Sequence, residues 1–238
     1  MRQKSKSPFQ IGWESAKANV VPMIVLSCLT LAIVVGYYNV PVIAQGLNPL
    51  AAWQNEWGWM AAFVNRSVFC VLLPGLFILP RTGLRPERPY AVLLGQMCWG
   101  GVCGVMTDWM FTLNAYLFGT GVDLLTLCIK TAVCQFAWTP LFFIPAGAVV
   151  YFWLGHGLSV DAARKDWPRH FLRDQILPNL LANWVIWIPA TVLIHCLPTA
   201  LQIQLSGTVG VFHALVMLKI GRGVTNGGTT GMSRLRCI

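Results

Sequence analysis

The sequence predicts an all-α membrane protein, a polytopic helix bundle with about six transmembrane helices and both chain ends in the cytoplasm. Of its 238 residues, 56% are hydrophobic and only 11% are charged, whereas soluble domains carry about 25% charged residues. Several uncharged stretches also reach the roughly 20 apolar residues that a helix needs to cross the hydrocarbon core. Because lipid offers no partner to free backbone groups, and the apolar runs are long rather than alternating, helices are expected instead of a β-barrel.

The chain divides into three regions by composition. Residues 1–17 form a basic N-terminal segment, in which Phe9, Trp13 and Ala16 recur at helical spacing. This spacing predicts a helix over about 8–19 that lies along the membrane surface. Residues 18–221 form a single transmembrane domain, and residues 222–238 form a Gly- and Thr-rich basic tail that we expect to be flexible.

Six spans are predicted within the transmembrane domain. In chain order they cover residues 18–45, 57–80, 90–118, 124–154, 176–202 and 203–221. A tight turn near Pro198 separates the last two. The connection between the fourth and fifth spans is predicted to include a surface helix, whose basic residues would meet anionic lipid headgroups.

The positions of Lys and Arg support an even number of spans. Basic residues cluster before the first span, between the second and third, between the fourth and fifth, and after the sixth, whereas the other three loops contain none. This alternation is what the positive-inside rule gives for six spans with cytoplasmic termini. Because the bases lie at helix ends, the formal charge of +9 does not indicate a nucleic-acid partner. With no clear organelle signal, a bacterial inner membrane is favoured over an organelle membrane.

Three charged residues lie well inside the predicted spans: Arg66, Asp108 and Lys130. An ionised group at the bilayer centre costs about 2.5–3.5 kcal/mol on insertion scales, so such residues normally face the bundle interior or a watery cavity. At 1.5 Å per residue, Arg66 and Asp108 both lie roughly 14 Å from the same membrane face. Their spans are consecutive and antiparallel, so an ion pair between them is one expected arrangement.

Gln135, His195 and His213 add polar side chains at similar depth on the fourth, fifth and sixth spans. With the three charges, they are predicted to line a water-filled vestibule or substrate site. The alternative is purely structural: one buried pair locks two helices, Lys130 extends outward to water, and each histidine bonds a backbone carbonyl.

No motif indicates enzymatic or metal chemistry. The eight cysteines include no CxxC pair, so neither a disulfide framework nor a zinc site is expected. HExxH, GxSxG and paired carboxylates are also missing. We therefore predict a protein that is not an enzyme and uses no cofactor or metal. Gly100 and Gly104 form a GxxxG spacing that permits close helix approach without identifying the partner, so a homo-oligomer remains open.

Three segments, taken in order, resemble the Mpv-seventeen/peroxisomal membrane protein twenty-two family. They read GGVCGVMTDWMFTLNAYLFG, KTAVCQFAWTPLFFIPAG and LPNLLANWVIWIPATVLIHCLPTALQIQL, and the likeness extends across roughly residues 90–219. The signature residues that match are Pro140, Asn183, Trp184, Trp187 and Pro189.

The match to this family has departures. Cys134 stands where the family has an acid before Gln135, and the family's arginine after the late proline is missing. The first two spans look like an N-terminal extension of bacterial relatives.

The resemblance implies a pore or channel-like role, since members of that family are proposed to act as metabolite channels. The surplus of Arg66 and Lys130 over Asp108 favours small polar or anionic solutes. The alternative hypothesis is a membrane scaffold or stress-related membrane protein that transports nothing.

Overall fold

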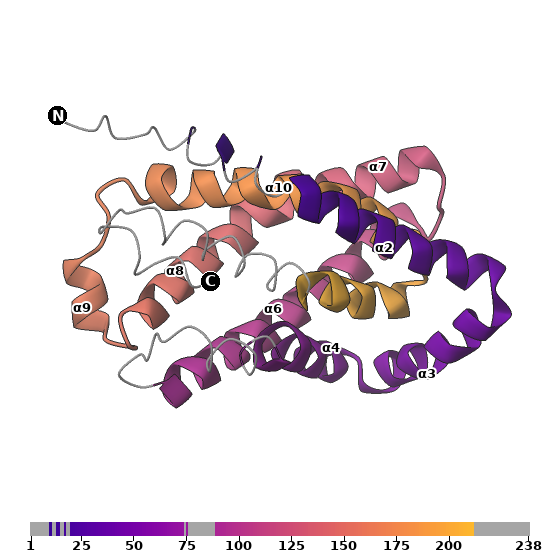
Figure 1. The fold of residues 1–238 in the computed structure, drawn as a ribbon, viewed down its shortest axis with the longest axis horizontal. Coiled ribbons are helices and arrows are strands. Elements are labelled where there is room, and N and C mark those ends of the chain that lie inside the picture. The colour runs from indigo at the N-terminus through magenta and orange to yellow at the C-terminus, as the bar shows by residue number, and fades with distance from the viewer. Residues whose placement is uncertain are drawn as a thin grey trace.

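The computed structural model describes residues 20–73, 75 and 89–211, together with positions 10, 13, 14 and 17. Every regular element in these residues is a helix, which confirms the all-α class (Figure 1). The four positions near the N-terminus are helical, within the surface helix predicted over 8–19. The predicted tail at 222–238 lies outside the described residues.

Long helices alternate with short π-helical segments, which are labelled η. In chain order they are α2 (Val20–Asn39), α3 (Pro41–Trp57), α4 (Trp59–Asn65), η1 (Arg66–Leu72), α6 (Pro89–Phe118), α7 (Leu124–Ala132), η2 (Val133–Phe143), α8 (Ile144–Gly155), α9 (Val160–Lys165), η3 (Leu172–Ile176) and α10 (Leu177–His195). A final described helix covers residues 199–211.

Three helices are long and apolar enough to cross a membrane, judged by length and composition. They are Tyr90–Phe118, Leu124–Gly155 and Leu177–His195, and they match the predicted third, fourth and fifth spans. The bent pair α2 and α3 makes a fourth if it is counted as one span. These apolar helices are compatible with an integral membrane protein. The predicted second and sixth spans run beyond the described residues, and the total of six spans stays a prediction.

The predicted first span, 18–45, ends too late. α2 ends at Asn39, and α3 begins at Pro41 and turns by 103°. Val40 is extended, with φ −122° and ψ 101°, because the residue before a proline is disfavoured in the helical region. α3 therefore occupies what was predicted as an outer loop, and Gly58, with φ +50°, makes the turn into α4.

The predicted boundary between the fifth and sixth spans, 202/203, also lies too late. α10 ends at His195, and Pro198 precedes the helix over 199–211. This last helix lies in the middle of the bundle (Figure 1), and all of residues 201–207 are buried. Leu201, Leu205 and Val209 belong to the main hydrophobic core, which they share with α2, α6, η2 and α10.

The glycines of α6 allow the close helix approach that their GxxxG spacing predicts. A Cβ placed on Gly104 would lie 2.3 Å from the carbonyl oxygen of Ala62, and one on Gly101 would lie 2.4 Å from the ring of Phe63. Both distances are too short for any side chain. α4 and η1 therefore rest directly on the backbone of α6, which brings Arg66 into the interior of the bundle.

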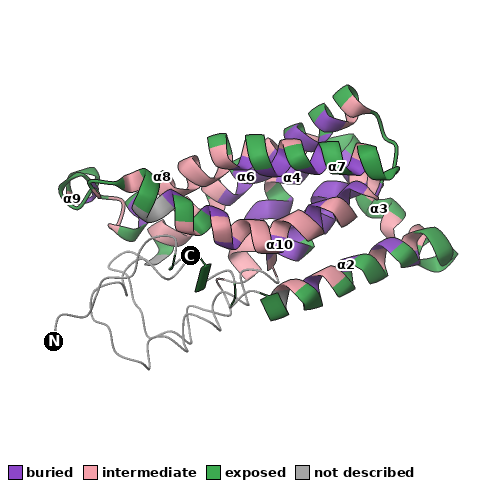
Figure 2. Ribbon diagram, turned by 90° about the horizontal axis from the view of Figure 1, so that it is seen from above, coloured by how far each residue is buried: buried purple, intermediate pink, exposed green. Residues whose placement is uncertain are grey.

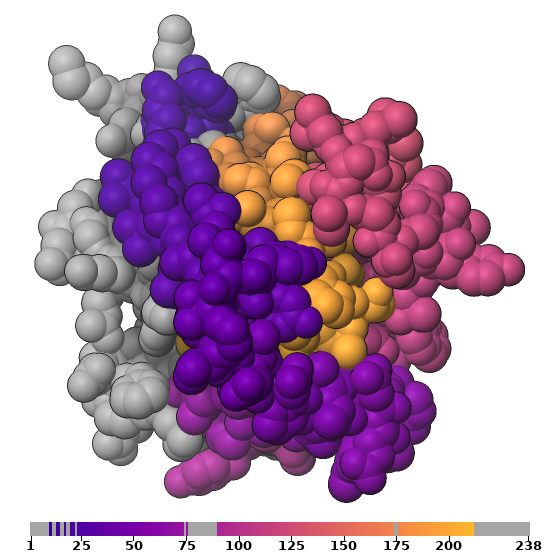
Figure 3. All heavy atoms as spheres, turned by 90° about the vertical axis from the view of Figure 1, so that its right-hand side faces the viewer, coloured from indigo at the N-terminus to yellow at the C-terminus, as the bar shows by residue number. Residues whose placement is uncertain are grey.

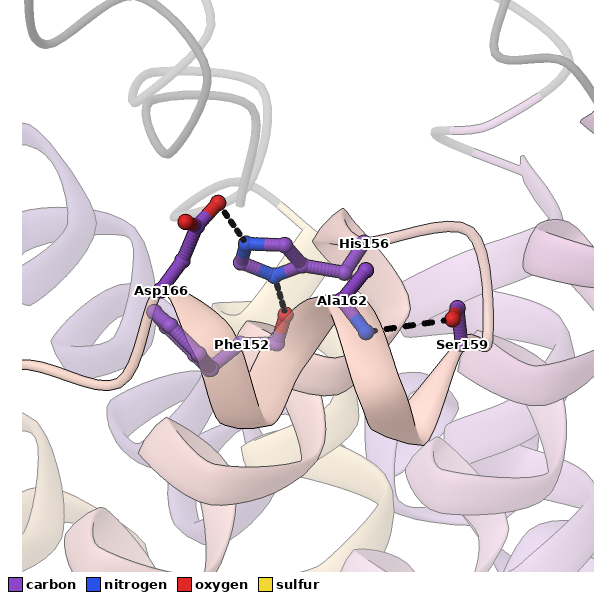
Figure 4. A network of polar contacts seen from close by, with 5 residues as sticks. All are labelled: Phe152, His156, Ser159, Ala162 and Asp166. Atoms are coloured by element: carbon purple, nitrogen blue, oxygen red, sulfur yellow. Dashed lines mark hydrogen bonds and ion pairs between the residues drawn. The ribbon is translucent and has the colours of Figure 1, made fainter.

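The segment between α8 and α10 contains the predicted surface helix, α9, which Figure 4 shows. The Ser159 hydroxyl accepts a hydrogen bond from the Ala162 N–H at 3.2 Å and so caps this helix. His156 Nδ1 donates to the Phe152 carbonyl at 2.7 Å, and its Nε2 lies 3.3 Å from a carboxylate oxygen of Asp166. These contacts fix the orientation of α9 relative to α8.

The two ends of the bundle differ in charge. The α9 segment carries basic residues, among them Arg164 and Lys165, whereas the turns at 119–123 and 196–198 contain neither Lys nor Arg. The α9 segment lies at one end of the long axis, and the turn between α6 and α7 lies at the other (Figure 1). The difference in Lys and Arg between the two ends agrees with the positive-inside pattern from which the topology was predicted.

The burial pattern is that of a membrane bundle rather than a soluble one. Large apolar side chains such as Leu124, Leu141 and Trp109 are exposed on outward faces, whereas polar side chains such as Asn114 and Thr191 are buried (Figure 2). A soluble monomer rarely exposes extended apolar surface. Lipid would cover these faces.

Candidate functional site

Arg66 begins η1 and is 7% exposed. Its Nη2 donates to the Ser206 hydroxyl at 3.3 Å, and its Nη1 lies 3.7 Å from the sulfur of Cys70. The guanidinium carbon lies 5.7 Å from the centre of the Trp187 ring, within range of a cation–π contact. Its Nε has no hydrogen-bond partner, and no ion pair within the described residues neutralises its charge.

Asp108 does not form the expected ion pair with Arg66. It accepts a hydrogen bond from Gln54 Nε2 of α3 at 2.9 Å. On α6, the residue that faces Arg66 is Gly104, where a Cβ would lie 2.7 Å from the arginine Cγ. Asp108 is four residues further along, or about 6 Å. The depth estimate failed because it placed an open loop where α3 carries Gln54.

Gln54 is the centre of a buried polar network that the sequence analysis missed. Its Oε1 accepts a hydrogen bond from Gln204 Nε2 at 3.2 Å, and Gln204 Oε1 accepts one from Asn65 Nδ2. The network thus joins α3, α4, α6 and the helix over 199–211. The sequence signal was the presence of uncharged amides in apolar helices, which also need partners in lipid.

Gln135 lies at the start of η2 and is held against α10 by two hydrogen bonds. Its Nε2 donates to the Thr191 hydroxyl at 2.9 Å, and its backbone carbonyl accepts from Trp184 Nε1 at 2.8 Å. In a π-helix a carbonyl bonds the N–H five residues later, and here that position is Pro140, which has no N–H. Trp184 therefore supplies the donor that Pro140 lacks, and two residues of the predicted signature share one structural role.

Arg66 and Gln135 line the same cavity, of about 390 Å³, which we call the Arg66 cavity. Helices α6, α8 and α10 and the π-helical segments η1 and η2 contribute to its wall, which also includes Trp138, Asn183 and Trp187. Among the described residues that line it, Arg66 is the one charged side chain. Ligand sites in proteins occupy about 300–1,000 Å³, so the cavity has the size of a small-molecule site.

The wall of the Arg66 cavity offers unused hydrogen-bonding groups of both kinds. Arg66 Nε and Trp138 Nε1 are donors without a partner, and Gln135 Oε1 is an acceptor without one. A buried polar group without a partner costs roughly 1–3 kcal/mol. Water or a polar solute in the cavity would satisfy these groups, and the uncompensated guanidinium would favour a negative charge.

His195 packs behind two residues of the wall of this cavity. It is 2% exposed, and its Nδ1 must carry the proton because it bonds the Thr191 carbonyl at 2.8 Å. Its Nε2 lies 3.9 Å from the sulfur of Cys134, and its ring meets that of Phe111 edge-on at 5.4 Å. Phe111 and Cys134 both line the cavity, whereas His195 does not, so His195 contacts the cavity wall from behind.

The other predicted site residues lie elsewhere. Lys130 is 2% exposed and lines a second cavity of about 370 Å³. His213 lies outside the described residues. The structure therefore brings Arg66 and Gln135 together with the signature residues Asn183 and Trp187, and it separates this group from Asp108 and Lys130. The expectation of one shared vestibule at a common depth is wrong for those two residues.

Comparison with known proteins does not identify the function of the site. No protein-family model matches this chain, and no curated protein or solved structure is found to be similar to it. Within the described residues, no group of three or more His, Cys, Asp or Glu side chains could hold a metal ion. The resemblance to the Mpv-seventeen family stays a prediction from the three quoted segments.

Proposed function

We propose that this membrane protein is a pore or channel-like protein that passes small polar or anionic solutes through the Arg66 cavity. The main support is that Arg66, which is 7% exposed, lines a cavity of about 390 Å³. The described residues of the cavity wall include no carboxylate. An uncompensated charge in a low-dielectric interior is costly to maintain. A solute that arrives with a negative charge would offset that cost.

The wall of the cavity fits a small organic anion better than a bare cation. Arg66 Nε and Trp138 Nε1 can donate to oxygen atoms, while Gln135 Oε1 can accept from a hydroxyl group. Trp187 covers the guanidinium face, and Nε is the guanidinium nitrogen without a partner among the described residues, which leaves it for recognition of an oxyanion. We place the protein in a bacterial inner membrane and in the Mpv-seventeen family as part of the same proposal.

Reversal potentials of the purified protein in planar bilayers under a KCl gradient test this function. The wild type should prefer anions. Arg66→Gln should lower the ratio of anion to cation permeability by about tenfold, the effect of one unit charge at a few ångströms in a partly aqueous site. Arg66→Lys should keep most of the preference, because it keeps the charge.

Arg164→Gln is the matched control, because it removes one Arg that is exposed on α9. It should leave the permeability ratio unchanged. Equal ratios in the wild type and in Arg66→Gln would exclude Arg66 from the pathway and overturn the proposal.

A membrane scaffold that transports nothing is the second candidate. The contacts of His195 with Phe111 and Cys134 favour it, because they are those of a packed helix interface. This function predicts no conductance for the wild type at any voltage, with Arg66 and Gln135 substitutions changing only the thermal stability in detergent. Measurable anion flux through the wild type would exclude it.

A further inference from the structure

A second cavity lies where the turn between α6 and α7 approaches the ends of α2 and α10. Its volume is about 370 Å³, and its wall includes Tyr38, Thr120, Lys130, Cys196, Thr199 and Gln202. Figure 3 faces this end of the molecule and shows the segment after α10 between α2 and α3 on one side and the α7 region on the other. We call it the Lys130 cavity.

Lys130 brings a positive charge to the wall of this cavity. Its side chain is 2% exposed, and no hydrogen bond or ion pair to it occurs within the described residues. The nearest acid in sequence, Asp123, acts on Lys130 through its charge without forming an ion pair, and its carboxylate accepts the Thr126 N–H at 3.0 Å as the cap of α7. An ammonium group in a cavity wall is stabilised by an anionic or polar partner.

Gln202 adds an acceptor beside this cation. Its Nε2 donates to the Leu197 carbonyl at 2.8 Å, which fixes the amide, and its Oε1 is buried without a partner. The hydroxyls of Thr120 and Thr199 belong to the same wall. The cavity thus combines a cation and an amide acceptor, neither with a hydrogen bond from the described residues, with two hydroxyl groups.

We propose that the Lys130 cavity binds a small oxyanion, a carboxylate or a phosphate, that also carries a hydroxyl or N–H group. The ammonium group of Lys130 would take the oxyanion as a compact point charge, and Gln202 Oε1 would accept from the donor. The two threonines complete the coordination of a ligand of this size.

This site is distinct from the Arg66 cavity. Lys130 precedes Cys134 by one helical turn, Cys134 lines the Arg66 cavity, and the described walls of the two cavities share no residue. In a transporting protein it would collect anions at the end of the bundle whose turns, 119–123 and 196–198, contain no Lys or Arg. The binding site does not depend on transport, so it is tested without measuring flux.

Cys196 lines the cavity and serves as a built-in reporter. The detergent-purified full chain is treated with an anionic methanethiosulfonate (sulfonatoethyl) or a cationic one (trimethylammonioethyl), and modification of Cys196 is followed by peptide mass spectrometry. The ratio of the two rates cancels the intrinsic reactivity of the thiol. With Lys130 in place, the anionic reagent should be favoured by about tenfold.

Lys130→Gln should bring that ratio near to one, whereas Lys130→Arg should preserve it. Inorganic phosphate should protect Cys196 in the wild type but not in Lys130→Gln, when compared with KCl of equal ionic strength. Cys98, exposed on α6, provides the internal reference and should show no change in ratio.

Two results would overturn the site. One is an equal rate ratio at Cys196 in the wild type and Lys130→Gln, and the other is the absence of phosphate protection in the wild type. The phosphate arm uses the wild type alone, so it stands even if Lys130→Gln fails to fold. An unchanged permeability ratio in Arg66→Gln, which would overturn the proposed function, leaves both of these results unaffected, so the two proposals fail separately.

Discussion

The indole Nε1 of Trp184 lies 2.8 Å from the backbone oxygen of Gln135 and donates a hydrogen bond to it. That oxygen is the one that Pro140 cannot bond from five residues later in the π-helical segment η2. The contact joins η2 to α10 at the wall of the Arg66 cavity, and the Gln135–Thr191 hydrogen bond lies beside it. The irregular backbone of η2 is therefore satisfied by a side chain from a neighbouring helix, as membrane interiors require.

Removing this donor should destabilise the bundle. Trp184→Phe keeps an aromatic ring but leaves the Gln135 carbonyl without its partner, at a cost of about 1–3 kcal/mol. Pro140→Ala restores an N–H that can bond the same oxygen. In that background the cost of Trp184→Phe should shrink, with a coupling energy of about 1 kcal/mol. Thermal melting of the wild type, the two single variants and the double variant in one detergent completes the double-mutant cycle. Additive effects would show that the two residues act independently.

Close packing at Gly104 predicts a strong steric effect. A Cβ there would lie 2.3 Å from the Ala62 carbonyl oxygen and 2.7 Å from the Cγ of Arg66. Gly104→Ala should therefore force α4 and η1 away from α6, at a cost of about 1–3 kcal/mol. Gly46→Ala on α3 is the control, since a Cβ there meets nothing within 4 Å. It should be neutral or stabilising by up to about 1 kcal/mol. Equal melting temperatures for the two variants would contradict the packing.

The hydrogen bond between Gln54 and Asp108 predicts a structural rather than a selective role for this acid. Asp108→Asn retains an oxygen that accepts from Gln54 Nε2, so it should melt close to the wild type. Asp108→Leu leaves the Gln54 amide with one partner fewer, at a cost of about 1–3 kcal/mol. Because Asp108 does not line the Arg66 cavity, Asp108→Asn should not alter the bilayer permeability ratio. An altered ratio would place this carboxylate on the solute path.

Apolar length was sufficient to locate the helices that dominate the fold. The predicted spans 90–118 and 124–154 agree with the helices Tyr90–Phe118 and Leu124–Gly155 to within a residue or so. In both, the apolar stretch and the continuous helix begin and end at nearly the same residues. The break at Val40 was harder to place, since the residues on both sides of Pro41 are apolar. A proline in a membrane span does not by itself distinguish a bend from a re-entrant helix.

The composition of the candidate site was harder to predict than its location. Gln135 and Arg66 were identified because a polar residue in a long apolar run is costly without a partner. Their depths were estimated on straight α-helices, yet both lie in π-helical segments, η1 and η2. The wider turn shifts the faces that later side chains occupy. Gln54 was missed because α3 was expected to be a loop, so Asp108 was given the wrong partner.

The cap of α7 predicts a pH effect at the end of the bundle. The backbone N–H of Thr126 donates to the Asp123 carboxylate at 3.0 Å, and this hydrogen bond holds the pKa of Asp123 below its ordinary value. A carboxylate with a lowered folded-state pKa stabilises the fold fully above its unfolded value of about 3.9. The stabilisation is lost as the pH falls through the lower, folded value.

Asp123→Asn keeps a capping oxygen that does not titrate. From about pH 5 to about pH 3 the melting temperature of the wild type should therefore fall further than that of Asp123→Asn. Asp123→Ala should melt below both at neutral pH, and parallel pH curves for wild type and Asp123→Asn would show that the carboxylate does not act as a charged cap.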